Sequence, residues 1–428
     1  MWATLKERVR DLSERIVLAQ RPIRILNAIK TPERAIKEFK ASNYKDIPKL
    51  GKSDYDKAIL GFDTLEKKKE LSDLDSDIST QIGKAHPELA RLLSATVRQY
   101  SQVVDLLESR GSPDFYAFSK KLYGSSSDPI RSDKNTVFEM AKLLYRILSG
   151  IKNTIPVPNS AKTLSAQQAV DDLSARFLRY FGEAIPAILS DGVVADAAAG
   201  GDVVKIRSDR FFSPRDLDFL EVHEGWVHVG TSLGGRAQPV AKWLSVGPPR
   251  CTSTQEGLAV LMEIFTFRSS VTRAQKINDR IIAIAKAEEG ANLIEVFEYF
   301  RTEGYAEEEC LTNSMRVFRG TNLRDGAFTK DLSYCRGFVE NYNFLRAAIR
   351  ANKPFLIPFL FAGKLHVEDI PLLYQLHQQG IVTFPKFLPP QFSDINGLAV
   401  WMSFSSFFNK VDLKSVQSHY NSLFRKYV

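Results

Sequence analysis

Cysteine and histidine are both scarce in this sequence. Its 428 residues include three cysteines, Cys251, Cys310 and Cys335, and six histidines. Three irregularly spaced cysteines do not make the paired framework that stabilises small disulfide-rich proteins. The chain must therefore be held together by a hydrophobic core, and its length is ample for a large one. Because histidine is rare, two histidines beside an acidic residue are informative.

Long apolar runs are also missing. A membrane-spanning helix needs about 20 consecutive apolar residues, whereas the longest candidate, residues 354–363, is half as long and contains Pro358. We interpret it as a buried strand or core segment. Residues 1–20 alternate charged and apolar side chains where a signal peptide would have an apolar centre. We therefore expect a cytoplasmic protein without a membrane span.

Charge of one sign is only moderately in excess. The 58 Lys and Arg residues against 50 Asp and Glu residues give a net charge of +8, and the basic residues are scattered along the chain. No signature of a DNA- or RNA-binding module is present, so we expect no nucleic-acid partner. Hydrophobic residues at 44% and charged residues at 25% are typical of a soluble globular protein, and the length allows two or three domains. The oligomeric state stays open.

Two of the six histidines flank a glutamate in the segment HEGWVH, residues 223–228. This H-E-x-x-x-H pattern is one residue longer than the H-E-x-x-H of zinc peptidases. On an ideal α-helix, residues five apart lie about 140° from each other around the axis, too far to bind one ion. We therefore predict a helix that bulges by one residue, as π-bulges at functional sites do, with Gly225 lowering the cost of the distortion. The pattern indicates His223 and His228 as metal ligands and Glu224 as the catalytic carboxylate.

A third metal ligand is expected from the next helix. The segment TQEGLA, residues 254–259, places Glu256 28 residues after His228, at the start of an apolar-periodic run. Catalytic zinc sites of the His₂Glu class have three protein ligands and leave the fourth position to water. We therefore predict one Zn²⁺ per chain, bound by His223, His228 and Glu256. The alternative is that the histidines are ordinary helix residues, and this second motif weakens it.

Periodicity along the chain favours an α+β fold that is mostly helical. We expect an amino-terminal helix and extended arm in residues 1–55, a helical region in residues 56–185, and a zinc peptidase catalytic region in residues 186–428, packed as one body. The β-like runs 192–196 and 202–207 surround Ala199-Gly200-Gly201, which is a hairpin signal. Together with the predicted metal ligands, this hairpin predicts a gluzincin-like metallopeptidase with a small antiparallel sheet beside the HExxxH helix.

The sheet and the arm each have a functional and a structural interpretation. Ser213 and Pro214 are typical of a helix start, and the helix that they open, residues 217–229, carries the metal motif directly after the strands. An exposed strand edge there would pair with an extended peptide and lay its scissile bond over the metal; purely structural strands are the equal alternative. Residues 22–55 would fit a peptide groove, so an autoinhibitory arm is a further hypothesis.

Basic and tyrosine side chains follow the metal motifs. Arg316 and Arg319 lie in one short segment, and Lys330 and Tyr334 come soon after it. Such side chains suit the binding of a substrate carboxylate and of an oxyanion. We predict Arg316, Arg319 and Lys330 as substrate-binding candidates. For the oxyanion, Tyr334 is the first candidate and Arg319 the second. Solvated surface positions are the alternative for each basic residue.

The sequence resembles one known family over roughly residues 60–428. The segments that carry the resemblance are HEGWVH, TQEGLA, RGSPDFYAFSKKLYG, AAAGGDVVKIR, RVFRG and FTKDLSYCRGF. They are similar to the QEGLA-motif proteins, whose bacterial members are named for modulating flavohaemoglobin expression. Their animal relatives are the microtubule-associated tyrosine carboxypeptidases, which remove the carboxyl-terminal tyrosine of α-tubulin. The resemblance implies a zinc metallopeptidase with zinc on His223, His228 and Glu256 and with Glu224 as its catalytic carboxylate.

Motif and resemblance together predict a zinc-dependent carboxypeptidase. It would remove one residue, tyrosine or another aromatic, from the carboxyl-terminal tail of a protein or peptide, with Glu224 accepting the proton of the attacking water. A zinc endopeptidase or an aminopeptidase is the alternative, and the latter would need carboxylates such as Glu263 and Glu221 for the substrate's amino group. A non-catalytic, zinc-containing regulatory protein is the third hypothesis, which the intact Glu224 disfavours.

Overall fold

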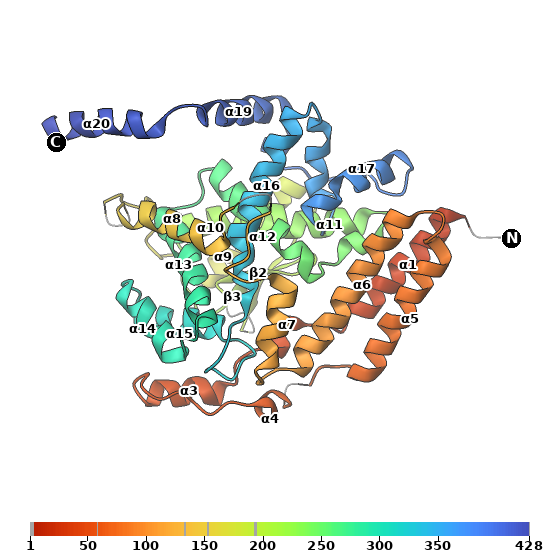
Figure 1. The fold of residues 1–428 in the computed structure, drawn as a ribbon, viewed down its shortest axis with the longest axis horizontal. Helices are drawn as coiled ribbons and strands as arrows, with labels where there is room; N and C mark the ends of the chain where they lie inside the picture. The colour runs from red at the N-terminus through yellow and green to blue at the C-terminus, as the bar shows by residue number, and fades with distance from the viewer. Residues whose placement is uncertain (1–3, 58, 132–133, 152–153, 192–194, 428) are drawn as a thin grey trace.

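The structure of the chain, a computed structural model, describes residues 4–57, 59–131, 134–151, 154–191 and 195–427. Helices form most of it, together with one small sheet (Figure 1). The first half contains α1 (Leu5–Gln20), α2 (Ile25–Ala28), α3 (Glu33–Ala41), α4 (Lys52–Tyr55), α5 (Thr64–Ile82), α6 (Pro87–Glu108), α7 (Asp114–Tyr123), α8 (Val137–Ser149), α9 (Ala166–Phe181), β1 (Ala187–Ser190), β2 (Ala197–Ala199) and β3 (Val204–Arg207). The mostly helical α+β fold expected from the sequence is confirmed.

The second half begins with a continuous helical rod, residues 214–237, which carries the HExxxH motif. It contains α10 (Pro214–Leu220), η1 (Glu221–Val229), α11 (Gly230–Ala237), η2 (Lys242–Ser245), η3 (Pro249–Cys251), α12 (Thr252–Phe265), α13 (Val271–Glu288), α14 (Leu293–Thr302), α15 (Glu307–Val317), η4 (Thr329–Asp331), α16 (Leu332–Arg350), η5 (Pro354–Phe361), η6 (Val367–Asp369), α17 (Ile370–Gln378), α18 (Pro390–Ser393), α19 (Ile395–Phe408) and α20 (Leu413–Tyr427). None of the described helices combines the length and the apolar character needed to cross a membrane.

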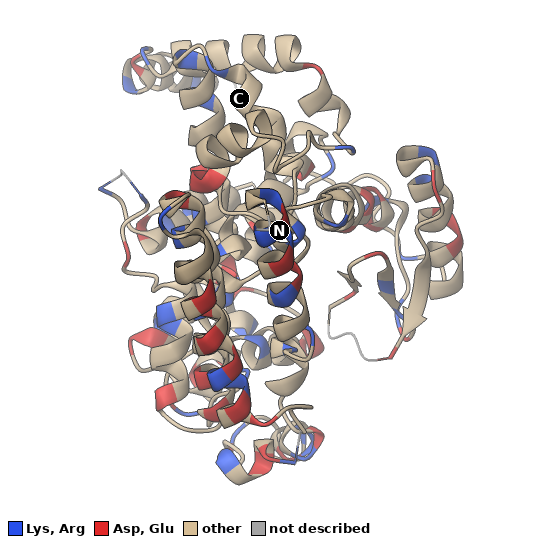
Figure 2. Ribbon diagram, turned by 90° about the vertical axis from the view of Figure 1, so that its right-hand side faces the viewer, with Lys and Arg blue, Asp and Glu red and all other residues tan. Residues whose placement is uncertain are grey.

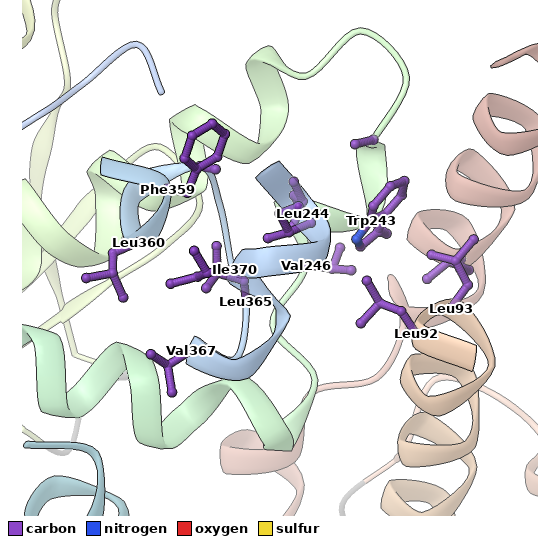
Figure 3. Packing of buried hydrophobic residues seen from close by; sticks show 14 of the residues in the cluster. Leu92, Leu93, Trp243, Leu244, Val246, Phe359, Leu360, Leu365, Val367 and Ile370 are labelled. Atoms are coloured by element: carbon purple, nitrogen blue, oxygen red, sulfur yellow. The ribbon is translucent and has the colours of Figure 1, made fainter. Parts of the chain in front are cut away.

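One hydrophobic core joins segments that lie far apart in the sequence. It extends from Val9 in α1 to Met402 in α19. Figure 3 shows Leu92 of α6 and Trp243 of η2 on one side of Leu244, and Phe359 and Leu360 of η5 on its other side. The core therefore includes residues from all three regions expected from the sequence, whose boundaries stay predictions. The apolar run at residues 354–363 forms the buried 3₁₀ helix η5, so the core segment predicted there is confirmed.

The amino-terminal arm packs against α14 and α15. It contains the short helices α2, α3 and α4, so it is less extended than expected. Tyr44 stacks on Phe297 with ring centroids 4.3 Å apart, and Lys40 pairs with Glu308 at 2.6 Å. Among the described residues, no hydrogen bond, ion pair or ring contact joins residues 22–55 to the predicted metal ligands.

The sheet is mixed, in the order β1-β3-β2. β2 and β3 form the antiparallel hairpin expected around Gly200, but β2 begins at Ala197 instead of within residues 192–196, of which 192–194 lie outside the described residues. β1 pairs parallel to β3, so the prediction of a purely antiparallel sheet was wrong. The reason is that β1 reaches β3 by a crossover, and a parallel pair leaves no tight-turn signal in the sequence. β2 remains at the edge of the sheet, beside η1.

Two glycines allow α12 and α16 to cross at very close range. A Cβ atom on Gly257 would overlap the backbone of Gly337, and a Cβ on Gly337 would overlap the backbone of Ser253. Gly257 directly follows the predicted ligand Glu256, and α16 carries Tyr334 one turn before Gly337. Because no side chain separates the two helices at this point, Tyr334 is held close to the predicted ligand. The glycine of the QEGLA segment is therefore a packing requirement.

We expect Gly257→Ala to lower the free energy of unfolding by about 3 kcal/mol or more, because the new methyl group meets backbone that cannot turn away. Urea denaturation followed by circular dichroism measures the change. Gly150→Ala is the matched control, since a Cβ there would meet only one atom, Ile147 O at 3.9 Å. Equal stability of Gly257→Ala and the wild type would contradict the close crossing.

Candidate metal centre

The two motif histidines and Glu256 converge on one point. The distance from His223 Nε2 to Glu256 Oε2 is 3.7 Å, and that from His228 Nε2 to the same oxygen is 3.6 Å. The imidazole rings lie 5.0 Å apart between centroids and are nearly perpendicular, at 86°. Each of the three residues offers one ligand atom, and these atoms lie within 4.8 Å of one another. Among the described residues this is the one such cluster of potential ligands.

The donor set and the spacing fit a small divalent ion. Ligand atoms about 2.1 Å from a tetrahedral zinc ion lie roughly 3.4 Å from each other, close to the separations in the cluster. The His223 side chain is 4% exposed and that of Glu256 11%, so water competes little for the ligands. Two imidazoles and one carboxylate form the His₂Glu set of catalytic zinc sites. These residues therefore form a possible metal site.

A π-helix brings the two histidines together. Residues 221–229 form the π-helix η1 between α10 and α11, and Ser213 caps the start of the rod by accepting a hydrogen bond from the Asp216 amide at 3.0 Å. Hydrogen bonds of the i→i+5 type widen each turn, so residues five apart come to lie on a shared face. The predicted distortion is confirmed, and it extends over nine residues instead of one turn.

Gly225 serves a different purpose from the one expected. Its φ does not lie in the left-handed region, so the backbone does not need glycine for its conformation. A Cβ atom here would instead overlap the ring of Phe177 in α9. The missing side chain lets α9 pack directly against the π-helix, on which the geometry of the ligands depends.

A buried carboxylate and an arginine orient His223. Glu263 Oε1 lies 2.7 Å from His223 Nδ1, and Arg273 of α13 donates to both oxygens of Glu263 at 2.6 Å. Burial alone would raise the pKa of Glu263, but the charge and hydrogen bonds of Arg273, together with those of His223, outweigh it and lower that pKa to about 2. The ionised carboxylate accepts a hydrogen bond from the Nδ1–H group, which leaves His223 Nε2 free to bind a metal. Glu263 is therefore not free to bind a substrate's amino group.

The sequence offered a signal for this role of Glu263 that we did not use. Glu263 follows Glu256 by seven residues, two helical turns, so both face the same side of α12. Glu221, the other carboxylate considered for an amino group, accepts hydrogen bonds from Arg268 at 2.5 Å and from Arg176 at 3.2 Å. Both carboxylates are thus paired with arginines inside the protein.

Lys364 and Gln255 support the second histidine. Lys364 Nζ donates to His228 O and to Gln255 Oε1, both at 2.8 Å. Thr231 Oγ1 donates to the same Gln255 oxygen at 2.8 Å. Burial lowers the pKa of Lys364 to about 8, opposed by the charge of Glu256. Sequence reasoning missed Lys364 because it lies more than a hundred residues from the motifs, with no pattern of its own.

Glu224 lies between the possible metal site and the edge strand. Its Oε2 accepts a hydrogen bond from the Ala199 amide of β2 at 2.8 Å. The backbone of β2 thus fixes the orientation of the carboxylate that the sequence predicts to be catalytic. The contact also shows that the Ala199 amide points away from β3 and toward the site.

Tyr334 lies beside the possible metal site, and its hydroxyl can donate a hydrogen bond. Its ring lies 6.4 Å from the His223 ring and nearly parallel to it, at 23°. Burial, and then the negative charge of Glu256, raise the pKa of Tyr334 far above its usual value. Its hydroxyl therefore stays protonated near neutral pH.

Beyond Tyr334 lies a group of arginines that share one carboxylate. Arg316 donates to both oxygens of Asp331, at 2.5 and 2.9 Å, and Arg280 reaches the same residue at 3.4 Å. Arg280 also lies over the Tyr334 ring, 5.6 Å from its centroid. The sequence analysis did not single out Arg280.

The three predicted substrate-binding residues differ in their partners. Arg316 is paired with Asp331, and Lys330 Nζ lies 2.6 Å from Glu256 Oε1. Arg319 makes no hydrogen bond or ion pair within the described part of the chain. Burial, followed by the like charge of Arg316, lowers the pKa of Arg319 to about 10, which still leaves it protonated at neutral pH. Arg319 is therefore the cation of this group with spare donors.

We expect Glu263→Gln to weaken zinc binding about 10- to 100-fold, because the change leaves Arg273 without its counter-charge and loosens the orientation of His223. Competition with a fluorescent zinc chelator measures the affinity. Glu309→Gln, which removes a carboxylate from an exposed pair with Lys276, is the matched control. Unchanged affinity in a folded Glu263→Gln variant would rule out this role.

Comparisons with known proteins agree with the geometry. The family described as microtubule-associated tyrosine carboxypeptidase matches residues 37–410, which is most of the chain. A search among individual curated proteins finds no match. The family is one of metallopeptidases that remove a carboxyl-terminal tyrosine, and its match includes every residue of the possible metal site, His223, His228 and Glu256. The chain belongs to the microtubule-associated tyrosine carboxypeptidase family.

Proposed function

We propose that the chain is a zinc-dependent carboxypeptidase that removes a carboxyl-terminal tyrosine or another aromatic residue from a protein tail. The observation that carries the proposal is that two features lie side by side. The His223–His228–Glu256 cluster suits an ion that activates water. Beyond Tyr334, whose ring lies beside that of His223, Arg319 is a cation without a partner among the described residues and interacts electrostatically with Tyr334. A carboxypeptidase needs such a cation for the terminal carboxylate of its substrate.

Zinc is the ion that best fits the three ligands. A neutral imidazole with its second nitrogen bonded to a carboxylate is a usual zinc ligand, and the His₂Glu set leaves a fourth position for water. When bound, zinc would lower the pKa of that water and polarise the substrate carbonyl. We propose one zinc ion per chain.

The chain's own groups supply the proton transfers and the stabilising hydrogen bonds. Glu224, oriented by the Ala199 amide at 2.8 Å, accepts a proton from the attacking water and returns it to the leaving amine. The protonated hydroxyl of Tyr334 donates to the oxygen on which negative charge develops. Arg319 remains the second candidate for that donor and our first choice for the terminal carboxylate.

The edge of β2 suits an extended substrate tail. The Arg207 amide donates to Asp196 O at 3.0 Å, and the Gly200 amide donates to Val203 O at 2.6 Å. The backbone groups of Asp196 and Gly200 therefore face β3. The strand alternates, and the backbone groups of Ala197 and Ala199 therefore face the other way, toward η1 and Glu224. A tail added along this edge by strand pairing would pass the possible metal site, with Ala197 as its backbone partner, because the Ala199 amide already donates to Glu224.

Charge around the site favours an anionic group of the substrate. Five cations and three carboxylates lie around Tyr334 in the described part of the chain, so the excess is +2 (5 − 3). They are Arg273, Arg280, Arg316, Arg319 and Lys330 against Glu256, Glu263 and Asp331. A metal ion would add to it. Because an uncompensated charge in a partly buried site is costly, a terminal carboxylate bound there would be stabilised.

The alternatives have less support. An aminopeptidase would need free carboxylates, and Glu263 and Glu221 are both engaged by arginines. An endopeptidase has no use for a carboxylate site beside the metal. A regulatory protein with a structural metal has no use for Glu224 as a base. Following the family, we propose the carboxyl-terminal tail of tubulin as the substrate class, in the cytoplasm and without a nucleic-acid partner.

We expect Glu224→Gln to lower kcat on a tyrosine-ending peptide by roughly 10²- to 10⁴-fold, as loss of a general base does, while zinc stays bound. Mass spectrometry of the peptide counts the residues released. Glu289→Gln on the surface is the control for the same chemical change. Equal rates of tyrosine release by Glu224→Gln and the wild type would refute the assignment of Glu224.

We expect Arg319→Ala to lower kcat/KM about 100-fold on a peptide with a free carboxyl terminus, because hydrogen bonds to a charged group contribute about 1.5–3 kcal/mol. The same peptide with an amidated terminus should be cleaved equally slowly by the variant and the wild type. Arg324→Ala is the control, since the Arg324 side chain is exposed and donates to Ile47 O in the arm. A similar loss on both peptides would mean that Arg319 does not bind the carboxylate.

A further inference from the structure

The outer face of α19 is apolar and uncovered. One side of the helix packs on α16 and the core through Leu398 and Met402. The opposite side carries Val400, Phe404 and Phe407, and the Phe407 side chain is 63% exposed. A helix that is apolar all round is normally covered on every side. Part of the apolar surface of α19 is therefore not covered by the rest of the described chain.

The next helix, α20, has an apolar stripe and no buried residue. The stripe consists of Leu413, Val416, Tyr420, Leu423, Phe424 and Tyr427. At 100° per residue these six positions fall within an arc of about 100°. Figure 1 shows α19 and α20 leaving the body of the molecule at its upper edge, so that α20 lies beside no other helix. α20 also lies beyond the residues that match the family.

The polar side of this segment is basic. Residues 395–428 include Lys410, Lys414, Arg425 and Lys426 but only one acid, Asp412, so their net charge is +3 (4 − 1). The whole chain carries +8 over 428 residues, so a large share of the excess lies in this short segment. In Figure 2 the top of the molecule, where the chain ends, is mostly tan with blue patches.

We propose that α19 and α20 bind the surface of an anionic lipid bilayer, with the apolar stripe of α20 and the outer face of α19 in the interface. Helices that lie in a bilayer interface combine an apolar side of aromatic and leucine residues with a polar side rich in Lys and Arg. The exposed aromatics Phe404, Phe407, Phe408, Tyr420, Phe424 and Tyr427 provide the first property, and the four basic residues provide the second. Each basic residue near an anionic surface adds to the attraction.

Charge favours lipid over a second copy of the chain as the occupant. Two copies of the segment would bring together two surfaces of +3, which repel, whereas an anionic bilayer neutralises them. A self-associating pair of helices usually has acidic as well as basic residues beside its apolar seam. This segment has a single acid, Asp412.

Flotation of the full-length protein with vesicles tests the proposal. We expect binding to vesicles of phosphatidylcholine mixed with phosphatidylserine, weaker binding to phosphatidylcholine alone, and release by added salt. Leu423→Asp should weaken binding at least about tenfold, because it places a charge in the stripe in place of an apolar side chain. Ser418→Asp makes the same change of charge on the polar side of α20 and should weaken binding less.

Two further measurements distinguish loss of vesicle binding from unfolding and from a change of oligomeric state. Peptide cleavage by Leu423→Asp should equal that of the wild type, which shows that the body is folded. Light scattering should report the same oligomeric state for both proteins. Absence of binding to the anionic vesicles, or equal binding by both aspartate variants, would overturn the proposal. A wild-type dimer that Leu423→Asp dissociates, without vesicle binding, would assign the surface to a second copy instead.

Discussion

The π-helix formed by residues 221–229 is the constraint on which the rest of the structure depends. It lets His223 and His228, five residues apart, face the same carboxylate, Glu256, at 3.7 and 3.6 Å. An α-helix with the same sequence would direct the two imidazoles about 140° apart. The surroundings fit this wider turn: α9 packs on the bare face of Gly225, and α-helical segments continue the rod on both sides.

The possible metal site also depends on buried charges that balance one another. Glu263 and Arg273 orient His223, Lys330 neutralises one oxygen of Glu256, and Lys364 binds the backbone at His228. Burying single charges is costly, so each depends on its partner. The close crossing of α12 and α16 brings Tyr334 into the same small volume, which leaves the site preorganised for charge that develops during a reaction.

The possible metal site could be predicted from the sequence because its three residues lie in local motifs. Motif and spacing indicated His223, His228 and Glu256, and the spacing also required a distorted helix. The residues that hold the ligands in place were harder to find. Arg273 and Lys364 act through contacts between distant parts of the chain, where no short pattern forms. Glu263 was the exception, since its position seven residues after Glu256 indicates a shared helix face.

Strand pairing and the pairing of charged side chains were also hard to predict from the sequence. β1 joins β3 in parallel through a crossover, which lacks the turn signal that revealed the β2–β3 hairpin. The sequence also could not rank Arg316, Arg319 and Lys330. Their difference lies in their partners: Asp331 engages Arg316 and Glu256 engages Lys330, whereas Arg319 has no partner among the described residues. Such pairing is decided by tertiary structure, not by residue type.

Anomalous X-ray diffraction at the zinc absorption edge tests the central claim most directly. Crystals of the protein purified with zinc should show one strong peak per chain, between Nε2 of His223, Nε2 of His228 and Oε2 of Glu256. The peak should vanish in crystals of His228→Ala. A zinc peak at another place in the wild type, or none at these three side chains with zinc in excess, would contradict the account.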